Sequence, residues 1–193
     1  TDIVPRHGGG ATACRSKAWE KYHSFRFLAK LDDVFPYADH FFYNASHLVD
    51  NLDQLVDAED FKPVARQVCV PKDSRGPRLI SCEPRELMFI QQGVMRKLYS
   101  HVERHPLTAG FVNFTDQTIN QDKARLGSVD SSLATIDLKD ASDLVSWDLV
   151  KELFPDHVVR VLHATRSEET ELLDGSTREL HKFAPMGSAL CFP

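Results

Sequence analysis

The sequence predicts an α+β fold, because strand-like and helix-like segments are mixed along the chain without strict β-α-β alternation. A long apolar repeat at helical spacing occupies the middle of the chain, and short strand-like segments beside turn-forming residues lie on both sides of it. With 193 residues and 42% hydrophobic content, the chain is large enough to bury a core.

The first half of the chain is expected to open with two helices. Residues 16–30 carry aromatic side chains on one side of a helical projection, and residues 46–58 place leucine and valine on one face. Residues 64–70 and 78–82 are predicted strands, joined by the turn-rich basic loop PKDSRG. Pro84 suits the first turn of a helix, which the apolar repeat continues to about Glu103.

The second half alternates short elements. Residues 133–136 form a short apolar segment, predicted to be a strand that ends at Asp137. Ser146 is expected to cap a helix that stops before Pro155, and a further helix follows over 156–164. Asp174-Gly175 predicts a hairpin turn between 171–173 and 177–183.

Charge is distributed unevenly in a chain whose formal net charge is −5. Residues 31–60 contain eight acidic residues and no Lys or Arg, whereas residues 61–104 contain nine basic residues against four acidic ones. This favours an electropositive face beside an acidic one, with a solvated surface as the alternative. The four cysteines lack metal-ligand spacing and are predicted to be free thiols, and no apolar run is long enough to span a bilayer.

Three segments carry candidate chemistry. Asp137 follows the predicted 133–136 strand, and a carboxylate at a buried strand end needs a compensating cation, which Mg²⁺ bound to a triphosphate would supply. Asp143 lies six residues further on, where it could face the sugar of a nucleotide. The alternative is that these aspartates cap turns.

The basic loop presents Lys72, Arg75 and Arg78 within seven residues, a grouping suited to phosphate oxygens, with a solvated basic hairpin as the alternative. Behind the predicted 177–183 strand, Gly187 would permit a turn and close approach of a ligand, and Ser188 offers a hydroxyl.

The order and the amino-acid sequences of these segments resemble those of the β subunit of levivirus replicases. The similarity is carried by VPKDSRGPRLISCEP, by FTDQTINQDKARLGSVDSSLATIDLKDASDLVS and by KFAPMGSALCFP, and RHGGGAT is similar to a segment upstream in that family. The resemblance implies a right-hand polymerase fold, with fingers over 1–130, including a basic nucleotide-binding segment over 62–104. The first part of the palm would occupy 131–193.

The resemblance also implies residue roles. Asp137 would be the catalytic, metal-binding aspartate, and Asp143 would sense the ribose 2′-hydroxyl. Lys72, Arg75 and Arg78 would neutralise the incoming triphosphate, while Gly187 and Ser188 would begin the loop that positions template and nucleotide. The role of Asp140 stays open.

The implied activity is RNA-directed RNA synthesis with two Mg²⁺ ions, for which Mn²⁺ could substitute. Single-stranded RNA template, nascent RNA and ribonucleoside triphosphates would be the partners, with host translation proteins implied by the family alone. The expected location is the cytoplasm of an infected bacterium, with no membrane association.

No Gly-Asp-Asp sequence occurs in the chain, so we expect a polymerase truncated before that motif and inactive by itself. Two other functions stay open as alternatives: a reverse transcriptase-like polymerase, against which Asp143 and DQTINQ argue, and a non-catalytic RNA-binding module.

Overall fold

The computed structural model describes residues 3–17, 19–22, 25–51, 61–73 and 76–192, and it has the predicted α+β character. The α-helices are α1 (Ala29–Asp32), α2 (Tyr37–His40), α3 (Ala45–Asp50), α5 (Arg85–Arg104), α6 (Thr118–Asp130), α7 (Trp147–Leu153) and α8 (Asp156–Thr165). The strands are β1 (Val64–Asp73), β2 (Gly76–Cys82), β3 (Glu169–Glu171) and β4 (Thr177–Glu179). Short 3-10 turns complete the set: η1 (Glu20–Tyr22), η2 (Ala141–Leu144) and η3 (Ala189–Cys191). No helix in the described ranges is both long and apolar enough to cross a membrane.

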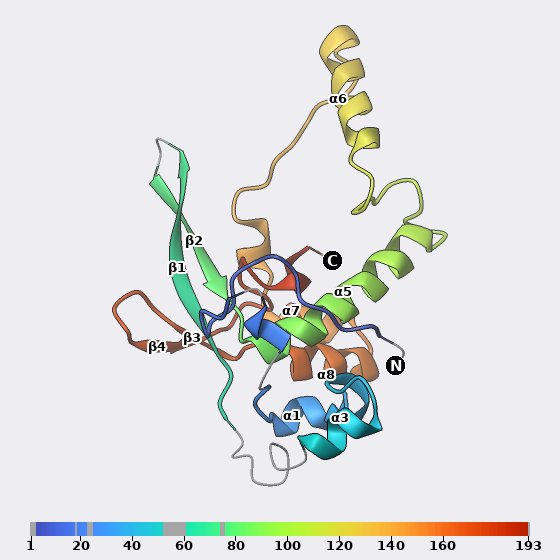
Figure 1. The fold of residues 1–193 in the computed structure, drawn as a ribbon. Helices are drawn as coiled ribbons and strands as arrows, with labels where there is room; N and C mark the ends of the chain where they lie inside the picture. The colour runs from blue at the N-terminus through green and yellow to red at the C-terminus, as the bar shows by residue number, and fades with distance from the viewer. Residues whose placement is uncertain (1–2, 18, 23–24, 52–60, 74–75, 193) are drawn as a thin grey trace.

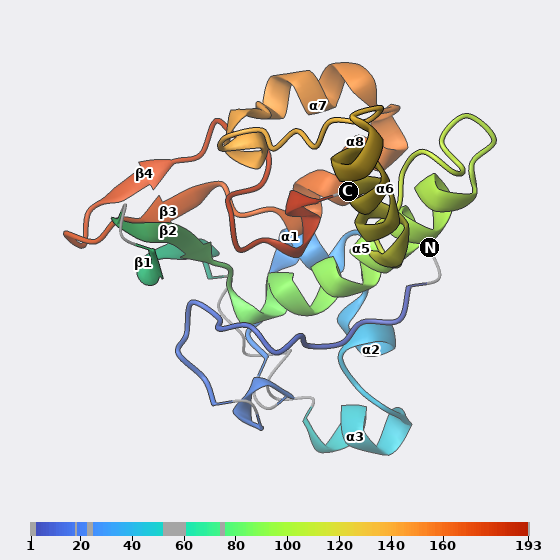
Figure 2. The same ribbon diagram turned by 90° about the horizontal axis from the view of Figure 1, so that it is seen from above.

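Helix α5 is the central element of the fold (Figures 1 and 2). It begins directly after Pro84, as predicted, and its residues Leu87, Ile90 and Val94 recur on one face and are buried. That face packs against α8 and η3, and seen from above α5 lies between α7 and α8 on one side and the N-terminal segment on the other. The long predicted helix is therefore confirmed, and it connects segments from both ends of the chain.

A four-stranded sheet in the order β2-β1-β3-β4 joins the two halves of the chain. β1 and β2 form an antiparallel hairpin with Cys69 opposite Leu79, while β1 pairs with β3 in parallel, Ala65 beside Thr170. β3 and β4 are antiparallel around the Asp174-Gly175 turn. Both predicted hairpins are confirmed, although the strands of the second are shorter than expected.

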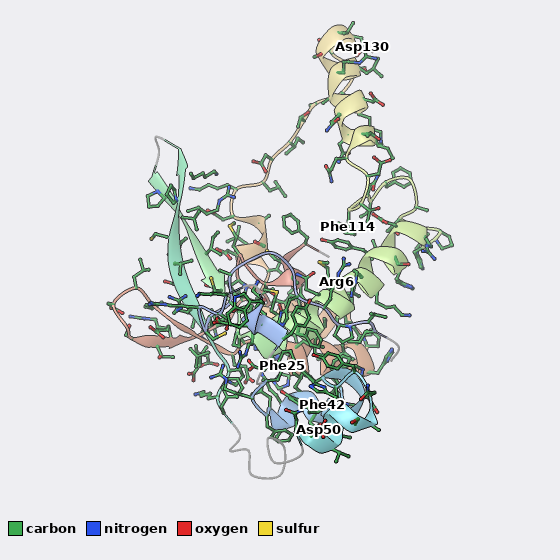
Figure 3. All side chains as sticks on the ribbon, viewed as in Figure 1. Arg6, Phe25, Phe42, Asp50, Phe114 and Asp130 are labelled. Atoms are coloured by element: carbon green, nitrogen blue, oxygen red, sulfur yellow. The ribbon has the colours of Figure 1, made fainter. Side chains whose placement is uncertain are left out.

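The core is built around aromatic rings beneath α5. Phe89 of α5 contacts Phe25 and Phe41 at centroid distances of 5.1 and 5.2 Å, and Tyr37 stacks on Phe41 at 4.0 Å. Figure 3 labels Phe25 within this densely packed region. The buried aliphatic members of the cluster are Leu28, Leu31, Leu87, Ile90, Val94, Val150, Leu162, Ala184 and Leu190.

The prediction of a helix over 16–30 was wrong. The segment contains η1 and the start of α1, and its described residues are held by tertiary contacts instead. The Lys21 ammonium donates to the carbonyls of Gly8 and Gly10, at 3.0 and 2.5 Å, and the backbone N–H of Arg26 donates to Glu86 at 3.0 Å. These contacts outside the segment outweigh its helical periodicity. In the predicted 46–58 helix, α3 covers 45–50 with Asn44 as its cap, and 52–58 lie outside the described residues.

Helix α6 was not predicted and projects away from the rest of the fold (Figures 1 and 3). Nearly all its side chains are exposed, with Asp130 at the far end. A stacked pair of rings, Tyr99 and Phe114 at 4.3 Å between centroids, supports the start of this extension. Its helical stretch has a weakly apolar face, which explains why periodicity did not reveal it.

The later elements follow the prediction closely. Ser146 accepts a hydrogen bond from the backbone N–H of Leu149 at 3.1 Å, so it caps α7 as expected, and α7 ends before Pro155. α8 then occupies the range predicted for the last helix. All four cysteines are free thiols.

Candidate nucleotide-binding site

The β1–β2 hairpin carries the predicted phosphate-binding cations at its outer part. Lys72 on β1 and Arg78 on β2 are both exposed, and Arg78 lies opposite Val70 in the register. The pairing shifts between Val70 and Asp73, which is a bulge beside Lys72. Arg75 lies outside the described residues. The hairpin thus exposes two of the three predicted cations without a carboxylate ion pair on either in the described structure.

The Gly187-Ser188 turn packs against the inner end of this hairpin. Gly187 has φ 123°, and a Cβ at this position would lie 2.3 Å from the carbonyl oxygen of Ser81. The backbone N–H of Ser81 donates to the carbonyl of Met186 at 2.8 Å, which fixes the turn on β2. Glycine is therefore required by both backbone conformation and close approach, although the approaching group is β2 itself.

Ser188 lies at the end of a buried hydrogen-bond chain. Its hydroxyl donates to Oε1 of Gln91 at 3.0 Å, and the N–H of Ala189 donates to the same oxygen at 3.1 Å. Gln91 in turn donates to the carbonyl of Thr165 at 2.7 Å. Gln91 is fully buried on α5, so one amide side chain ties the Gly-Ser turn to the end of α8.

Asp137 lies on an exposed connection, not at the end of a strand. Residues 132–138 have no regular secondary structure, and all residues of 131–140 are exposed, with Ile136 at 80%. The prediction of a strand over 133–136 was therefore wrong for this structure. A strand forms when a partner satisfies its backbone groups, and the segment pairs with no strand in the described ranges.

The three aspartates of the segment are not gathered together as metal ligands. Asp140 adopts a left-handed backbone at φ 53° before η2, and Asp143 turns back toward the fold. Within the described ranges, no group of three or more His, Cys, Asp or Glu side chains has the arrangement of a metal site. Asp137 can supply one exposed carboxylate ligand, which fits a shared site but does not complete one.

Asp143 forms an ion pair with Lys182, the residue that begins KFAPMGS. The Lys182 Nζ lies 2.9 Å from Oδ1 of Asp143, and that oxygen is buried. Backbone bonds flank the pair: Phe183 N–H donates to Val145 and Trp147 N–H donates to His181, both at 2.8 Å. The structure thus connects the two predicted segments that contain Asp143 and Ser188.

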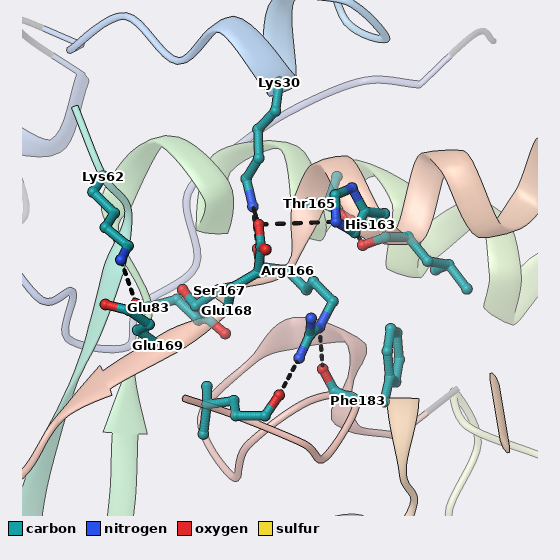
Figure 4. Close-up of polar contacts among 12 residues, drawn as sticks. Lys30, Lys62, Glu83, His163, Thr165, Arg166, Ser167, Glu168, Glu169 and Phe183 are labelled. Atoms are coloured by element: carbon teal, nitrogen blue, oxygen red, sulfur yellow. Dashed lines mark hydrogen bonds and ion pairs between the residues drawn. The ribbon is translucent and has the colours of Figure 1, made fainter. Parts of the chain in front are cut away.

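Arg166 supports this connection through its contacts with backbone carbonyls (Figure 4). Its guanidinium donates to the carbonyls of Leu180, Lys182 and Phe183 at 2.7, 3.1 and 3.3 Å, and it lies 5.0 Å from the Trp147 ring. Burial lowers the pKa of Arg166, with nearby glutamates opposing the shift. Because it is buried with three acceptors, Arg166 fixes the backbone on which Lys182 stands.

Glu83 is the second buried charge of the region and lies between β2 and α5 (Figure 4). The hydroxyl of Ser167 donates to its Oε2, whereas Oε1 is buried without a hydrogen-bond partner. Burial raises the pKa of Glu83 to about 7, against the opposing effects of Ser167, Gln91, Lys30 and Arg166. Near neutral pH this carboxyl is therefore poised between its charged and neutral forms.

Three of these residues were missed by sequence reasoning: Gln91, Arg166 and Lys182. Gln91 had a usable signal, because it is a polar residue next to Ile90 on the apolar face of the predicted 84–103 helix. Lys182 and Arg166 had none, since their partners are far from them in the sequence.

The fold and site together define a mixed α+β protein in which a Gly-Ser turn packs against the inner end of a basic hairpin and bonds to Gln91 of α5. An ion pair joins the segment before this turn to Asp143. Residues 6–193 match the family described as RNA replicase, beta-chain. The chain belongs to this family.

Curated relatives agree with that membership. Over 187 residues the chain is 35% identical to the RNA-directed RNA polymerase subunit beta of Qbeta virus (strain MX1), covering 97% of this chain and 30% of that protein. It is 38% identical over 133 residues to the corresponding subunit of Escherichia virus Qbeta, covering 69% of this chain and 22% of that protein. The RNA-directed RNA polymerase beta chain of Enterobacteria phage GA is 39% identical over 123 residues, 64% of this chain and 22% of that protein. The chain thus spans less than a third of the length of these relatives.

Proposed function

We propose that this chain supplies the nucleotide-binding surface and one catalytic carboxylate of an RNA-directed RNA polymerase. The observation that carries the proposal is the family match over 6–193, which contains every predicted site residue. In this proposal residues 1–130 serve as fingers and 131–193 as the first part of the palm. The substrates are ribonucleoside triphosphates and a single-stranded RNA template, in the cytoplasm of an infected bacterium.

The exposed cations on the hairpin would receive the triphosphate. Lys72 and Arg78 present charged heads to solvent, and the predicted third cation, Arg75, belongs to the same loop. Arg can donate two parallel hydrogen bonds to phosphate oxygens, which orients the phosphates as well as neutralising them. Gly187 and Ser188 would lie next to the inner end of the same hairpin and position the template and nucleotide.

Asp137 would be the ligand that this chain contributes to two Mg²⁺ ions, with Mn²⁺ as a substitute. When bound, such ions activate the RNA 3′-hydroxyl and stabilise the pyrophosphate leaving group. An exposed carboxylate on an unpaired segment suits a ligand shared with other carboxylates. Asp143 would stand beside the sugar and accept a hydrogen bond from its 2′-hydroxyl. Host translation proteins remain a family-level expectation to which no residue is assigned.

The test is steady-state RNA synthesis by a polymerase that carries these 193 residues, with Arg78→Ala as the variant. Loss of a charge-assisted phosphate contact worth about 1.5–3 kcal/mol should lower kcat/KM for nucleotides by about tenfold to 150-fold. Template affinity should stay within about twofold, since the contact is to the nucleotide. Arg160→Ala serves as the matched control, because Arg160 on α8 donates to the carbonyl of Asp33. A loss of template affinity with unchanged nucleotide kinetics would assign Arg78 to RNA binding instead.

A further inference from the structure

Lys182 has no role in the proposed function, yet it forms an ion pair with Asp143. Oδ1 of Asp143 is buried, and the Lys182 ammonium is 2.9 Å away. No described group donates to that oxygen at hydrogen-bond angles, so the contact is one of charge and not a directed hydrogen bond. The Asp143 side chain is 34% exposed although Oδ1 is buried, so the part that a ligand can reach lies away from Oδ1.

The backbone around the pair leaves little freedom in where Lys182 stands. Ser146 and Lys182 form an isolated antiparallel bridge. On either side of it, Phe183 bonds to Val145 and His181 to Trp147, so the residues after Asp143 are held against those around Lys182. Residues 145–147 and 181–183, which are distant in the sequence, are thereby held in a fixed antiparallel register.

Arg166 holds the same stretch from its other side. Its guanidinium bonds to the carbonyl of Lys182 itself and to those of Leu180 and Phe183. A buried cation with three carbonyl acceptors is costly to displace, because each acceptor would be left unpaired. The position of the Lys182 ammonium is therefore set by buried structure, unlike that of a lysine on a free surface.

We propose that Lys182 is a specificity-determining residue that holds the Asp143 carboxylate in the orientation that recognises the ribose 2′-hydroxyl. The inference rests on the proposed function, since it deepens the sugar-sensing role of Asp143. The Lys182 charge, 2.9 Å from Oδ1, favours the orientation in which Oδ1 stays buried and Oδ2 is left for the nucleotide. A site built to hydrogen-bond a hydroxyl rejects the analogue without it, provided that its acceptor is fixed.

The chain offers a matched control for this pair. Lys151 and Asp148 on α7 form an ion pair of similar length, 2.6 Å, on the surface, and the Asp148 side chain is 86% exposed. A surface pair of this kind contributes little to structure. Lys151→Met therefore removes the same charge without touching the predicted sugar site.

The experiment measures kcat/KM for one ribonucleotide and for its deoxy analogue, using a polymerase that carries these residues. The variants are Lys182→Met, Lys182→Arg, Asp143→Ala and the control Lys151→Met. Lys182→Met should lower the ribo-to-deoxy ratio by about tenfold, Lys182→Arg should recover most of it, and the control should leave it within about twofold. A merely structural role of Lys182 would lower both values together and leave the ratio unchanged.

The outcomes separate the inference from the function beneath it. If Asp143→Ala lowers the ratio and neither Lys182 variant changes it, Lys182 has no part in selection and the inference fails alone. A higher ratio in Lys182→Met would mean that the pair withholds Asp143 from the sugar, which also overturns it. An unchanged ratio in Asp143→Ala would remove the sugar role itself, and the inference with it. If Lys182→Met does not fold, the Lys182→Arg variant decides the question. Because Arg keeps the positive charge, the inference predicts a ribo-to-deoxy ratio within tenfold of the wild-type ratio, and a lower ratio contradicts the inference.

Discussion

Gly187→Ala tests whether the Gly-Ser turn depends on its close contact with β2. Gly187 has φ 123°, where a side chain is strained by about 1–3 kcal/mol. The new methyl would also lie 2.3 Å from the Ser81 carbonyl oxygen, a backbone atom that cannot turn aside. Relieving the overlap costs about 1–3 kcal/mol and breaks the Ser81–Met186 hydrogen bond, worth about 0.5–1.5 kcal/mol. The expected destabilisation is about 2.5–7.5 kcal/mol.

Gly76→Ala is the control, because Gly76 has nearly the same φ, 124°, and an added Cβ would meet nothing within 4 Å. Gly76→Ala should therefore be destabilised by the backbone strain alone, which costs about 1–3 kcal/mol. Urea unfolding followed by tryptophan fluorescence measures both variants against the wild type, and Trp147 stacks on Phe183, four residues before Gly187. Equal shifts of the unfolding midpoint in the two variants would refute the close contact as the cause.

Two further predictions concern the buried carboxyl and the chain by itself. Burial raises the pKa of Glu83 from 4.5 to about 7, so the folded state binds its proton more tightly than the unfolded state does. Its stabilising contribution is therefore complete below pH 4.5 and is lost as the pH rises through 7. The wild type should lose about 3 kcal/mol of unfolding free energy through this group between about pH 4.5 and 7.5, and Glu83→Gln should not. The difference in unfolding free energy between the two proteins, measured by urea titration at both pH values, should therefore shift by about 3 kcal/mol in favour of Glu83→Gln. Equal changes in unfolding free energy with pH in the two proteins would contradict this. Burial lowers the pKa of His7 to about 4, and because His7 is present in both proteins its contribution cancels in the difference. The 193 residues alone should not extend a primer with Mg²⁺ or Mn²⁺, because Asp137 provides one ligand where two ions need several carboxylates. Template-dependent extension by this chain would overturn that expectation.

Elements governed by local signals were predictable from the sequence. Helix α5 combines a proline at its start with an apolar repeat at helical spacing, and the β3–β4 hairpin contains an Asp-Gly turn. Ser146 caps α7 by accepting a hydrogen bond from Leu149, within the first turn of the same helix. Each of these structures depends on residues that are neighbours in the chain, so a single sequence contains the information that specifies them.

Elements that depend on distant partners were not predictable. The 16–30 segment has helical periodicity, but contacts from Glu86 and from the Gly8–Gly10 loop determine its path. The 133–136 segment has strand composition and lacks a pairing strand in the described structure. Periodicity reports which face could be buried and says nothing of what is available to cover it.

The candidate site divides in the same way. Asp137, Asp143 and Gly187 belong to sequence motifs, so the sequence was sufficient to single them out. The residues that hold two of the site positions, Lys182 beside Asp143 and Gln91 beside Ser188, contact them across long stretches of sequence. Such contacts follow from the fold, and no local pattern in the sequence specifies them.

Asp137→Asn in a polymerase that carries these residues tests the central claim most directly. Asparagine keeps the side-chain size and removes the charge that a metal ion needs, and Asp137 is exposed, so the fold should be unaffected. Template-dependent RNA synthesis should fall by about three orders of magnitude or more, while RNA affinity measured by titration stays near the wild-type value. Asp130→Asn, at the far end of α6, is the matched control and should retain full activity. Synthesis by Asp137→Asn within about tenfold of the wild type would contradict the assignment of Asp137 as a catalytic metal ligand.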